Sequence, residues 1–182
     1  MTYSFIHIPK TSGVTLDKLI QANPSCNLSY LQHLRVVDTV KLFTFVRNPY
    51  DRIVSAYFYL KSNKANEMQV AYNHIVSRYD SFKDFILNMD KDGLLEFITH
   101  IKPQWTWVIN ENGAIVPKVF KIEEPEKIDA FLAENGISGW QEQPKENTSE
   151  HEPYETYLDE EVIAEINRVY AKDFKLFNYH KL

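Results

Sequence analysis

The beginning of the chain constrains the fold most, because an apolar run there passes directly into a small polar turn. The run at 5–8 is followed by a turn that contains Lys10 and Gly13, and Leu16 and Leu19 then keep helical spacing. A strand, a tight turn and a helix in this order direct backbone N–H groups and the positive end of the helix dipole toward one point. The stretch therefore predicts an oxyanion site at the carboxyl end of a strand.

The residue types in the turn favour the same chemistry. Lys10 adds a point charge, and Thr11, Ser12 and Thr15 add hydroxyl donors. Gly13 is expected to let the backbone approach a ligand closely. The order is not that of a Walker A loop, in which the lysine follows the glycines. From this stretch alone, a βα turn with an ordinary surface lysine stays open as the alternative, since short phosphate-loop patterns match many unrelated proteins.

A second strand-to-helix junction follows later in the chain. Residues 42–46 are typical of a buried strand, and Arg47 stands at its carboxyl end. Asn48 is a good N-cap for a helix predicted over 49–60, and Ser55 lies within the first two turns of that helix. Two βα units that each present anion donors at a strand's carboxyl end are typical of nucleotide sites in open α/β sheets.

At this point the chain resembles the sulfotransferases, in the branch related to the Golgi carbohydrate sulfotransferases and their short bacterial relatives. In that family a His-Ile-Pro-Lys-Thr-x-Gly-x-Thr loop, here at 7–15, grips the 5′-phosphosulfate of 3′-phosphoadenosine 5′-phosphosulfate (PAPS). A Val-Arg-Asn-Pro-Tyr-Asp-Arg-x-x-Ser segment, here at 46–55, holds the 3′-phosphate through Arg47 and Ser55. The resemblance implies that the first loop binds the cofactor through Pro9, Lys10, Thr11, Ser12, Gly13, Val14 and Thr15.

By analogy with phosphoryl transfer, sulfuryl transfer needs a cation on the developing charge and a base for the attacking hydroxyl. We expect Lys10 to be the catalytic cation. His33 is the expected base, because it lies between the two motifs, where related carbohydrate sulfotransferases place a histidine. Its reference pKa near neutrality suits that role. A surface or packing role is the alternative for His33, and His7 is expected to be a packed histidine near the site.

Two further sets of residues lie in or directly beside weaker family-like segments. Lys145, Asn147 and Ser149 are expected to bind the cofactor from a loop that closes over the nucleotide. His100, Gln104 and Trp105 are expected to face the acceptor. Packing remains the alternative for His100 and Trp105.

The order of predicted elements favours an α/β layered domain with a mainly parallel central sheet flanked by helices. The resemblance implies the same fold, a relative of the P-loop kinases. The length suits a single domain over 1–182. Residues 23–38 are expected to be a loop with short ordered pieces. Residues 105–109 and 118–122 are expected to be two short strands joined by a turn, and 159–171 a final helix. Further helical patterns are predicted at 61–99 and 125–135.

Composition and charge exclude several classes of function and restrict the expected acceptor. The net charge of −5 argues against a broad nucleic-acid surface. A single cysteine, Cys26, excludes an intramolecular disulfide, and no cluster has metal-ligand spacing. We expect no transmembrane segment, no anchor and a cytoplasmic location, because no apolar run is long enough and no leader precedes the first strand. Because the best-argued basic residues would serve the cofactor, the expected acceptor is a neutral or weakly charged saccharide or small metabolite.

Three functions fit these observations. The first is a PAPS-dependent sulfotransferase that acts on a hydroxyl acceptor and releases adenosine 3′,5′-bisphosphate. The second is a nucleotide-dependent phosphotransferase on the same fold. Against it stand the missing Walker A order and the lack of an evident magnesium-binding aspartate after a strand. The third is a catalytically silent nucleotide-binding protein, which the short chain keeps open.

Overall fold

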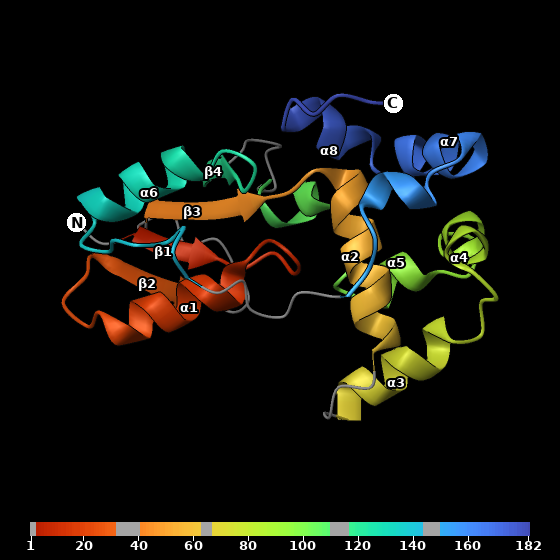
Figure 1. The fold of residues 1–182 in the computed structure, drawn as a ribbon, viewed down its shortest axis with the longest axis horizontal. Helices are drawn as coiled ribbons and strands as arrows, with labels where there is room; N and C mark the ends of the chain where they lie inside the picture. The colour runs from red at the N-terminus through yellow and green to blue at the C-terminus, as the bar shows by residue number, and fades with distance from the viewer. Residues whose placement is uncertain (1–2, 32–40, 63–66, 110–116, 144–149) are drawn as a thin grey trace. The chain divides into compact units, whose positions relative to one another are not determined.

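The chain forms two compact units, each made of two chain segments (Figure 1). Unit 1 comprises 1–47 and 104–146, and unit 2 comprises 48–103 and 147–182. The structure is a computed structural model. The residues that it describes are 3–31, 41–62, 67–109, 117–143 and 150–182. Within those ranges, none of the helices combines the length and the apolar character that crossing a membrane requires.

Unit 1 is built on a four-stranded sheet in which every pair of neighbouring strands is parallel. The strand order is β2-β1-β3-β4. The strands are β1 (Tyr3–Ile6), β2 (Leu28–Leu31), β3 (Lys41–Val46) and β4 (Lys118–Lys121). This arrangement confirms the predicted parallel sheet and the strands at 42–46 and 118–122. The sequence predicted a loop with short ordered pieces over 23–38, and β2 is such a piece, a four-residue strand paired with β1. Residues 32–38 lie outside the described residues.

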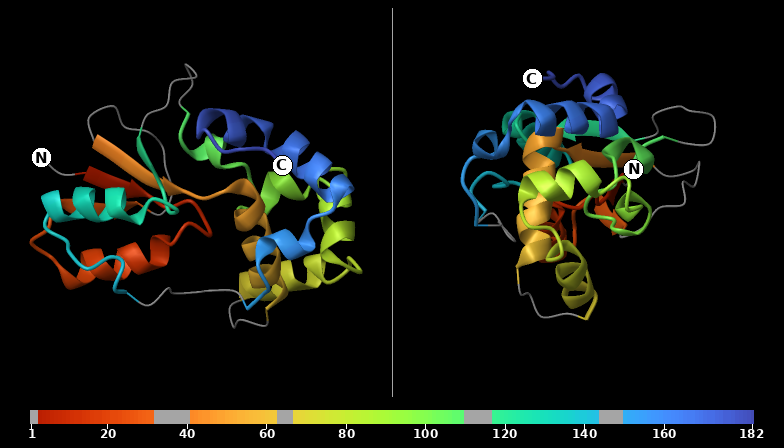
Figure 2. Two further views of the ribbon diagram at one scale, coloured as in Figure 1. Left: turned by 45° about the horizontal axis from the view of Figure 1, so that its top comes forward. Right: turned by 90° about the vertical axis from the view of Figure 1, so that its right-hand side faces the viewer.

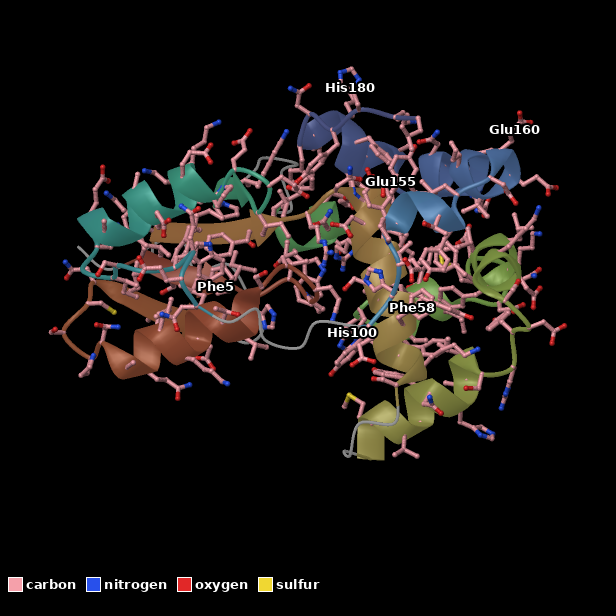
Figure 3. The ribbon with its side chains drawn as sticks, viewed as in Figure 1. Phe5, Phe58, His100, Glu155, Glu160 and His180 are labelled. Atoms are coloured by element: carbon pink, nitrogen blue, oxygen red, sulfur yellow. The ribbon has the colours of Figure 1, made fainter. Side chains whose placement is uncertain are left out.

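Two helices of unit 1 cover one face of this sheet. Helices α1 (Gly13–Ala22) and α6 (Pro125–Glu134) contribute apolar side chains to the same buried cluster as Phe5, Phe43 and Phe45. The ring of Phe43 lies 5.1 Å from that of Phe5, which Figure 3 labels among the strands. A row of aromatic rings at this spacing excludes water from the sheet and makes the strand ends rigid supports for the loops that follow them.

The predicted strand at 105–109 is wrong. Residues Gln104–Trp107 form a short 3-10 helix, η1, and only Ile109 makes an isolated bridge. The fully buried side chains here are Gln104 and Val108, which are four positions apart. Thr106, which lies between them, is exposed, whereas a strand would place residues 104, 106 and 108 on one face. Trp105 and Trp107 are both half-buried. The turn predicted at 110–113 lies outside the described residues.

Unit 2 is helical in all of its described elements. Figure 2 shows these helices from two directions. They are α2 (Pro49–Lys61), α3 (Glu67–Val76), α4 (Phe82–Asn88), α5 (Leu94–Phe97), the 3-10 helix η2 (Tyr154–Tyr157), α7 (Glu160–Val169) and α8 (Ala171–Leu176). The prediction at 49–60 is confirmed, including its cap, since the Asn48 side chain accepts a hydrogen bond from the Tyr50 N–H at 3.0 Å. The predicted final helix is found as α7, with α8 as a separate helix after it.

The core of unit 2 contains a buried arginine. Arg52 on α2 is 1% exposed, and its Nη1 donates to the carbonyl oxygen of Lys102 at 2.9 Å. The neighbouring carbonyl of Ile101 accepts a hydrogen bond from the hydroxyl of Tyr170 at 2.7 Å. Burial raises the pKa of the Tyr170 phenol above its ordinary value, so this donor stays protonated. Two polar side chains thus fix the segment at 101–102 inside unit 2.

Candidate functional site

The candidate site lies where two neighbouring strands of unit 1 end. Strands β1 and β3 are adjacent and parallel, so the loop after Ile6 and the residue after Val46 emerge at the same edge of the sheet. From β1 the chain continues to β2 on one side, and from β3 it continues to β4 on the other. Such a reversal in strand order is the usual position of ligand sites in open α/β sheets. The two sequence motifs therefore meet at this edge.

The loop after β1 holds two non-glycine residues in left-handed backbone conformations. Lys10 has φ 69° and Ser12 has φ 64°, a region that costs such residues on the order of 1–2 kcal/mol each. A left-handed residue beside a right-handed one turns successive N–H groups toward a common concavity that suits an anion. Strain of this kind is concentrated at functional positions in proteins. The loop geometry thus favours the predicted oxyanion site.

The start of α1 adds further N–H groups beside this loop. The first hydrogen bond of the helix runs from the Leu16 N–H to the Ser12 carbonyl at 3.3 Å. The N–H groups of Gly13 and Val14 precede this bond, so the helix itself offers them no acceptor. The Ser12 side chain does not cap the helix. These N–H groups lie at the positive end of the helix dipole, where an anion is stabilised.

Thr11 has a structural role within this loop. Its side chain is fully buried, and its Oγ1 donates to the carbonyl oxygen of Ile8 at 2.8 Å. The hydroxyl proton is therefore used inside the turn in this structure, and the role of Thr11 in binding the cofactor stays a prediction. This hydrogen bond helps to hold the turn in its strained form.

Gly13 accommodates the ring of His7. A Cβ at position 13 would lie 2.0 Å from Cδ2 of His7, far inside van der Waals contact. The His7 ring also stacks on Phe5, with 6.2 Å between ring centroids. This packing agrees with the predicted role of His7. It also gives a second reason for the glycine, because the His7 imidazole fills the space that a Cβ at position 13 would need. The expected close approach of the backbone to a ligand stays a prediction.

Arg47 is attached to the loop and to η1. Its Nη1 donates to the Lys10 carbonyl oxygen at 3.4 Å, a long hydrogen bond between the ends of β1 and β3. Its backbone N–H donates to Oε1 of Gln104 at 2.9 Å, and its carbonyl accepts from Nε2 of Gln104 at 2.8 Å. Gln104 is fully buried. Gln104, which the sequence predicts to face the acceptor, thus contacts the main chain of Arg47 in this structure.

The other predicted residues are divided between the two units. Trp105 is half-buried on η1 in unit 1. Ser55, which is 3% exposed on α2, and His100 belong to unit 2. The ring of His100, labelled in Figure 3, stacks on Tyr59 with 5.0 Å between centroids, as the packing alternative predicts. The cofactor and acceptor roles of these residues stay predictions.

Four predicted residues lie outside the described parts of the chain, namely His33, Lys145, Asn147 and Ser149. Their roles stay predictions. Among the described residues, no group of three or more histidine, cysteine, aspartate or glutamate side chains is arranged to hold a metal ion.

The sequence did not predict two features that are prominent in the structure. It assigned no role to Arg52, which is buried in unit 2. It also missed the contact between Gln104 and Arg47, which are 57 residues apart along the chain. No local pattern signals such a contact, because hydrogen bonds between distant residues follow from the tertiary fold.

Comparison with known proteins supports the reading of the two motifs. A family model described as "Sulfotransferase family" matches residues 7–180. The match includes residues of both units and extends from the first motif to His180, which Figure 3 labels near the end of the chain. Comparisons with curated proteins and with solved structures gave no match.

Proposed function

The chain belongs to the sulfotransferase family, and from this premise we propose that it transfers a sulfuryl group from PAPS to a hydroxyl acceptor and releases adenosine 3′,5′-bisphosphate. One observation carries the proposal. The strained loop at 9–15 and Arg47 follow two adjacent parallel strands and are joined by the hydrogen bond from Arg47 to the Lys10 carbonyl. Both are rich in donors, and the loop contains no acidic residue that would repel an anion.

In this proposal the loop binds the 5′-phosphosulfate and Arg47 binds the 3′-phosphate. Bound PAPS supplies a sulfuryl group on a phosphate leaving group. The N–H groups of Gly13 and Val14 and the Lys10 ammonium offer donors and positive charge to the phosphosulfate. An arginine can form paired, charge-assisted hydrogen bonds with a phosphate. Ser55 would add a hydroxyl to the 3′-phosphate.

The reaction needs little covalent help from the protein. The acceptor oxygen forms a bond to sulfur while the bond between sulfur and the bridging phosphate oxygen breaks. Lys10 would stabilise the charge that develops on that oxygen. The proton of the acceptor hydroxyl would pass to His33, the proposed base. Lys145, Asn147 and Ser149 are proposed to contact the nucleotide from the late loop.

We propose a neutral or weakly charged saccharide or small metabolite as the acceptor. The net charge of −5 supports this choice, since a polyanionic acceptor would need a broad basic surface. His100 and Trp105 are the residues proposed to face it, with aromatic rings suited to stacking on a sugar. The cytoplasmic location stays a prediction from the sequence.

A thermal-shift comparison tests the cofactor. Adenosine 3′,5′-bisphosphate should raise the melting temperature more than ATP with magnesium does, because only the former carries a 3′-phosphate. Stronger stabilisation by ATP and magnesium would favour the phosphotransferase alternative and contradict the proposal. Turnover of PAPS against a panel of hydroxyl acceptors then separates an active sulfotransferase from a silent nucleotide-binding protein, in which no acceptor would be sulfated.

A further inference from the structure

The main-chain N–H and carbonyl of Arg47 are both hydrogen-bonded to the side chain of Gln104. Its Oε1 accepts from the Arg47 N–H at 2.9 Å, and its Nε2 donates to the Arg47 carbonyl at 2.8 Å. We call this pair of hydrogen bonds the Gln104 clamp. Gln104 is fully buried, so water does not compete for either bond. The clamp therefore fixes the peptide groups on both sides of the Arg47 Cα.

The clamp lies where strand pairing ends. The last registered pair between β3 and β4 is Val46 with Lys121, and the carbonyl of Val46 accepts from the N–H of Ile122 at 3.0 Å. Arg47 comes directly after this pair and is the last residue of the first segment of unit 1. Gln104 is the first residue of the second segment. The side-chain amide thus extends the hydrogen bonding of β3 by one residue, in place of a strand.

We propose that Gln104 is a positioning residue, which aims the Arg47 guanidinium at the 3′-phosphate without touching the nucleotide itself. The inference rests on the proposed function. An arginine whose main chain is fixed loses less conformational freedom when its head binds a phosphate. The same fixed main chain holds Nη1 of Arg47 within reach of the Lys10 carbonyl, at 3.4 Å. Gln104 would therefore set affinity for the 3′-phosphate specifically.

The test uses two substitutions of nearly the same size as glutamine. Gln104→Met keeps the volume but can form neither hydrogen bond. Gln104→Glu restores both bonds only when its carboxyl is protonated, because the protonated acid has one donor and one acceptor. Burial raises the pKa of such a carboxyl, so the neutral form should persist at moderately acid pH. The matched control is Gln21→Glu, on an exposed position of α1 about 12 Å along the helix from Gly13.

The readout is the ratio of dissociation constants for adenosine 5′-phosphate and adenosine 3′,5′-bisphosphate, measured by calorimetry between about pH 5 and pH 8. Each variant is compared with the wild type at the same pH, which removes the titration of the nucleotide phosphates near pH 6. In Gln104→Glu the ratio should match the wild type at acid pH and fall at least about tenfold below it as the carboxyl ionises. In Gln104→Met the ratio should be low at every pH, and in Gln21→Glu it should not change.

The outcomes separate this inference from the proposed function. If the wild type does not prefer the bisphosphate, the proposed function and this inference both fail. If the wild type prefers it and both Gln104 variants keep that preference, only this inference fails. Equal loss of affinity for both nucleotides would also overturn it, since that is the effect of general damage to unit 1.

Hydrogen exchange on the unaltered protein provides a second test in case the variants do not fold. The Arg47 amide should exchange slowly in the nucleotide-free protein, because it is bonded to a buried acceptor. Binding of adenosine 3′,5′-bisphosphate should slow it further, and adenosine 5′-phosphate should slow it less. Rapid exchange of this amide, or equal protection by both nucleotides, would overturn the role of the clamp.

Discussion

Arg47 and Arg52 belong to the same sequence motif but to different units. Arg47 is half-buried at the end of β3, its main chain is clamped by Gln104, and its head makes a long hydrogen bond of 3.4 Å to Lys10. Arg52 is 1% exposed on α2, and its head donates to the Lys102 carbonyl at 2.9 Å. At Arg47 the side chain of Gln104 holds the main chain, whereas at Arg52 a main-chain carbonyl holds the guanidinium. A single motif can therefore combine a residue that is proposed to bind a ligand with one that holds the fold.

The two units differ in the same way. In unit 1 the residues of the candidate site lie in a strained loop, with left-handed Lys10 and Ser12. In unit 2 buried polar side chains bond to main-chain carbonyls, as Tyr170 does to Ile101 and Arg52 does to Lys102. Strain at a ligand site costs stability that packing elsewhere must offset. Substitutions should consequently affect mainly binding and turnover in the loop of unit 1, and mainly stability in the core of unit 2.

The largest effect is expected for Lys10→Ala. Turnover of PAPS should fall about 10²–10³-fold, since a cation placed on developing charge contributes on the order of 3–4 kcal/mol. The melting temperature should change little, because alanine occupies the left-handed conformation about as poorly as lysine does. Lys18→Ala, an exposed lysine on α1, is the control and should keep full activity. Near-normal turnover in Lys10→Ala would refute the assignment.

Arg52→Met should destabilise the protein by about 3 kcal/mol. The substitution keeps the apolar stem but leaves the buried Lys102 carbonyl without its charged donor. Urea unfolding followed by circular dichroism measures the change. The matched variant Arg47→Met should change the free energy of unfolding by less than about 1 kcal/mol, because its main-chain hydrogen bonds remain. Equal destabilisation by the two variants would remove the contrast between the arginines.

Arg47→Met should instead weaken binding of adenosine 3′,5′-bisphosphate relative to adenosine 5′-phosphate. A charge-assisted hydrogen bond to phosphate contributes roughly 1.5–3 kcal/mol, so the ratio of dissociation constants should fall about 10- to 150-fold. Ser55→Ala should lower the same ratio by less, since a neutral hydroxyl contributes about 1 kcal/mol. Calorimetry with both nucleotides provides the measurement. Equal losses for the two nucleotides would place Arg47 away from the 3′-phosphate.

Gly13→Ala should destabilise unit 1 by about 1–2 kcal/mol, because the new methyl group would overlap the His7 ring. The double variant His7→Ala/Gly13→Ala provides the decisive comparison. It should be more stable than the sum of the two single changes predicts, since removing the ring also removes the clash. Additive effects in thermal unfolding would show that His7 is not what requires a glycine at this position.

The smallest effect concerns the pH dependence of unit 2. The Val162 N–H and, to a lesser extent, the Lys83 ammonium hold the pKa of Asp159 below its ordinary value. A lowered pKa means that Asp159 stabilises the fold fully above its unfolded pKa, and that this contribution is lost as the pH falls through the folded pKa.

Asp159→Asn separates the charge from the cap of α7, because the amide oxygen still accepts from the Val162 N–H. The variant should melt slightly below the wild type at pH 7, and the difference should shrink at about pH 2, because the contribution of the charge is lost as the pH falls through the folded pKa of Asp159. Asp159→Ala, which removes the cap as well, should melt lower at both pH values. A difference between wild type and Asp159→Asn that does not shrink in acid would contradict the assigned cause.

The sequence alone was sufficient wherever the determining contacts are local. The start of α2 is an example, since its cap joins Asn48 to Tyr50, two residues away. Apolar runs, turn residues and helical spacing likewise predicted the strand, turn and helix around Lys10. The order of the predicted elements then predicted the parallel sheet. The family motifs could be read from the sequence for the same reason, because each is continuous along the chain.

Only the tertiary structure decided which residues in and near those motifs touch one another. The pattern at 105–109 suggested a strand, but residues Gln104–Trp107 form a 3-10 helix, with Gln104 buried and Thr106 exposed. A family-like segment suggested that Gln104 would face the acceptor, which stays a prediction, and only the structure shows that its amide holds the main chain of Arg47. Contacts across such distances depend on how strands and helices pack, and packing is a property of the whole chain that no local pattern records.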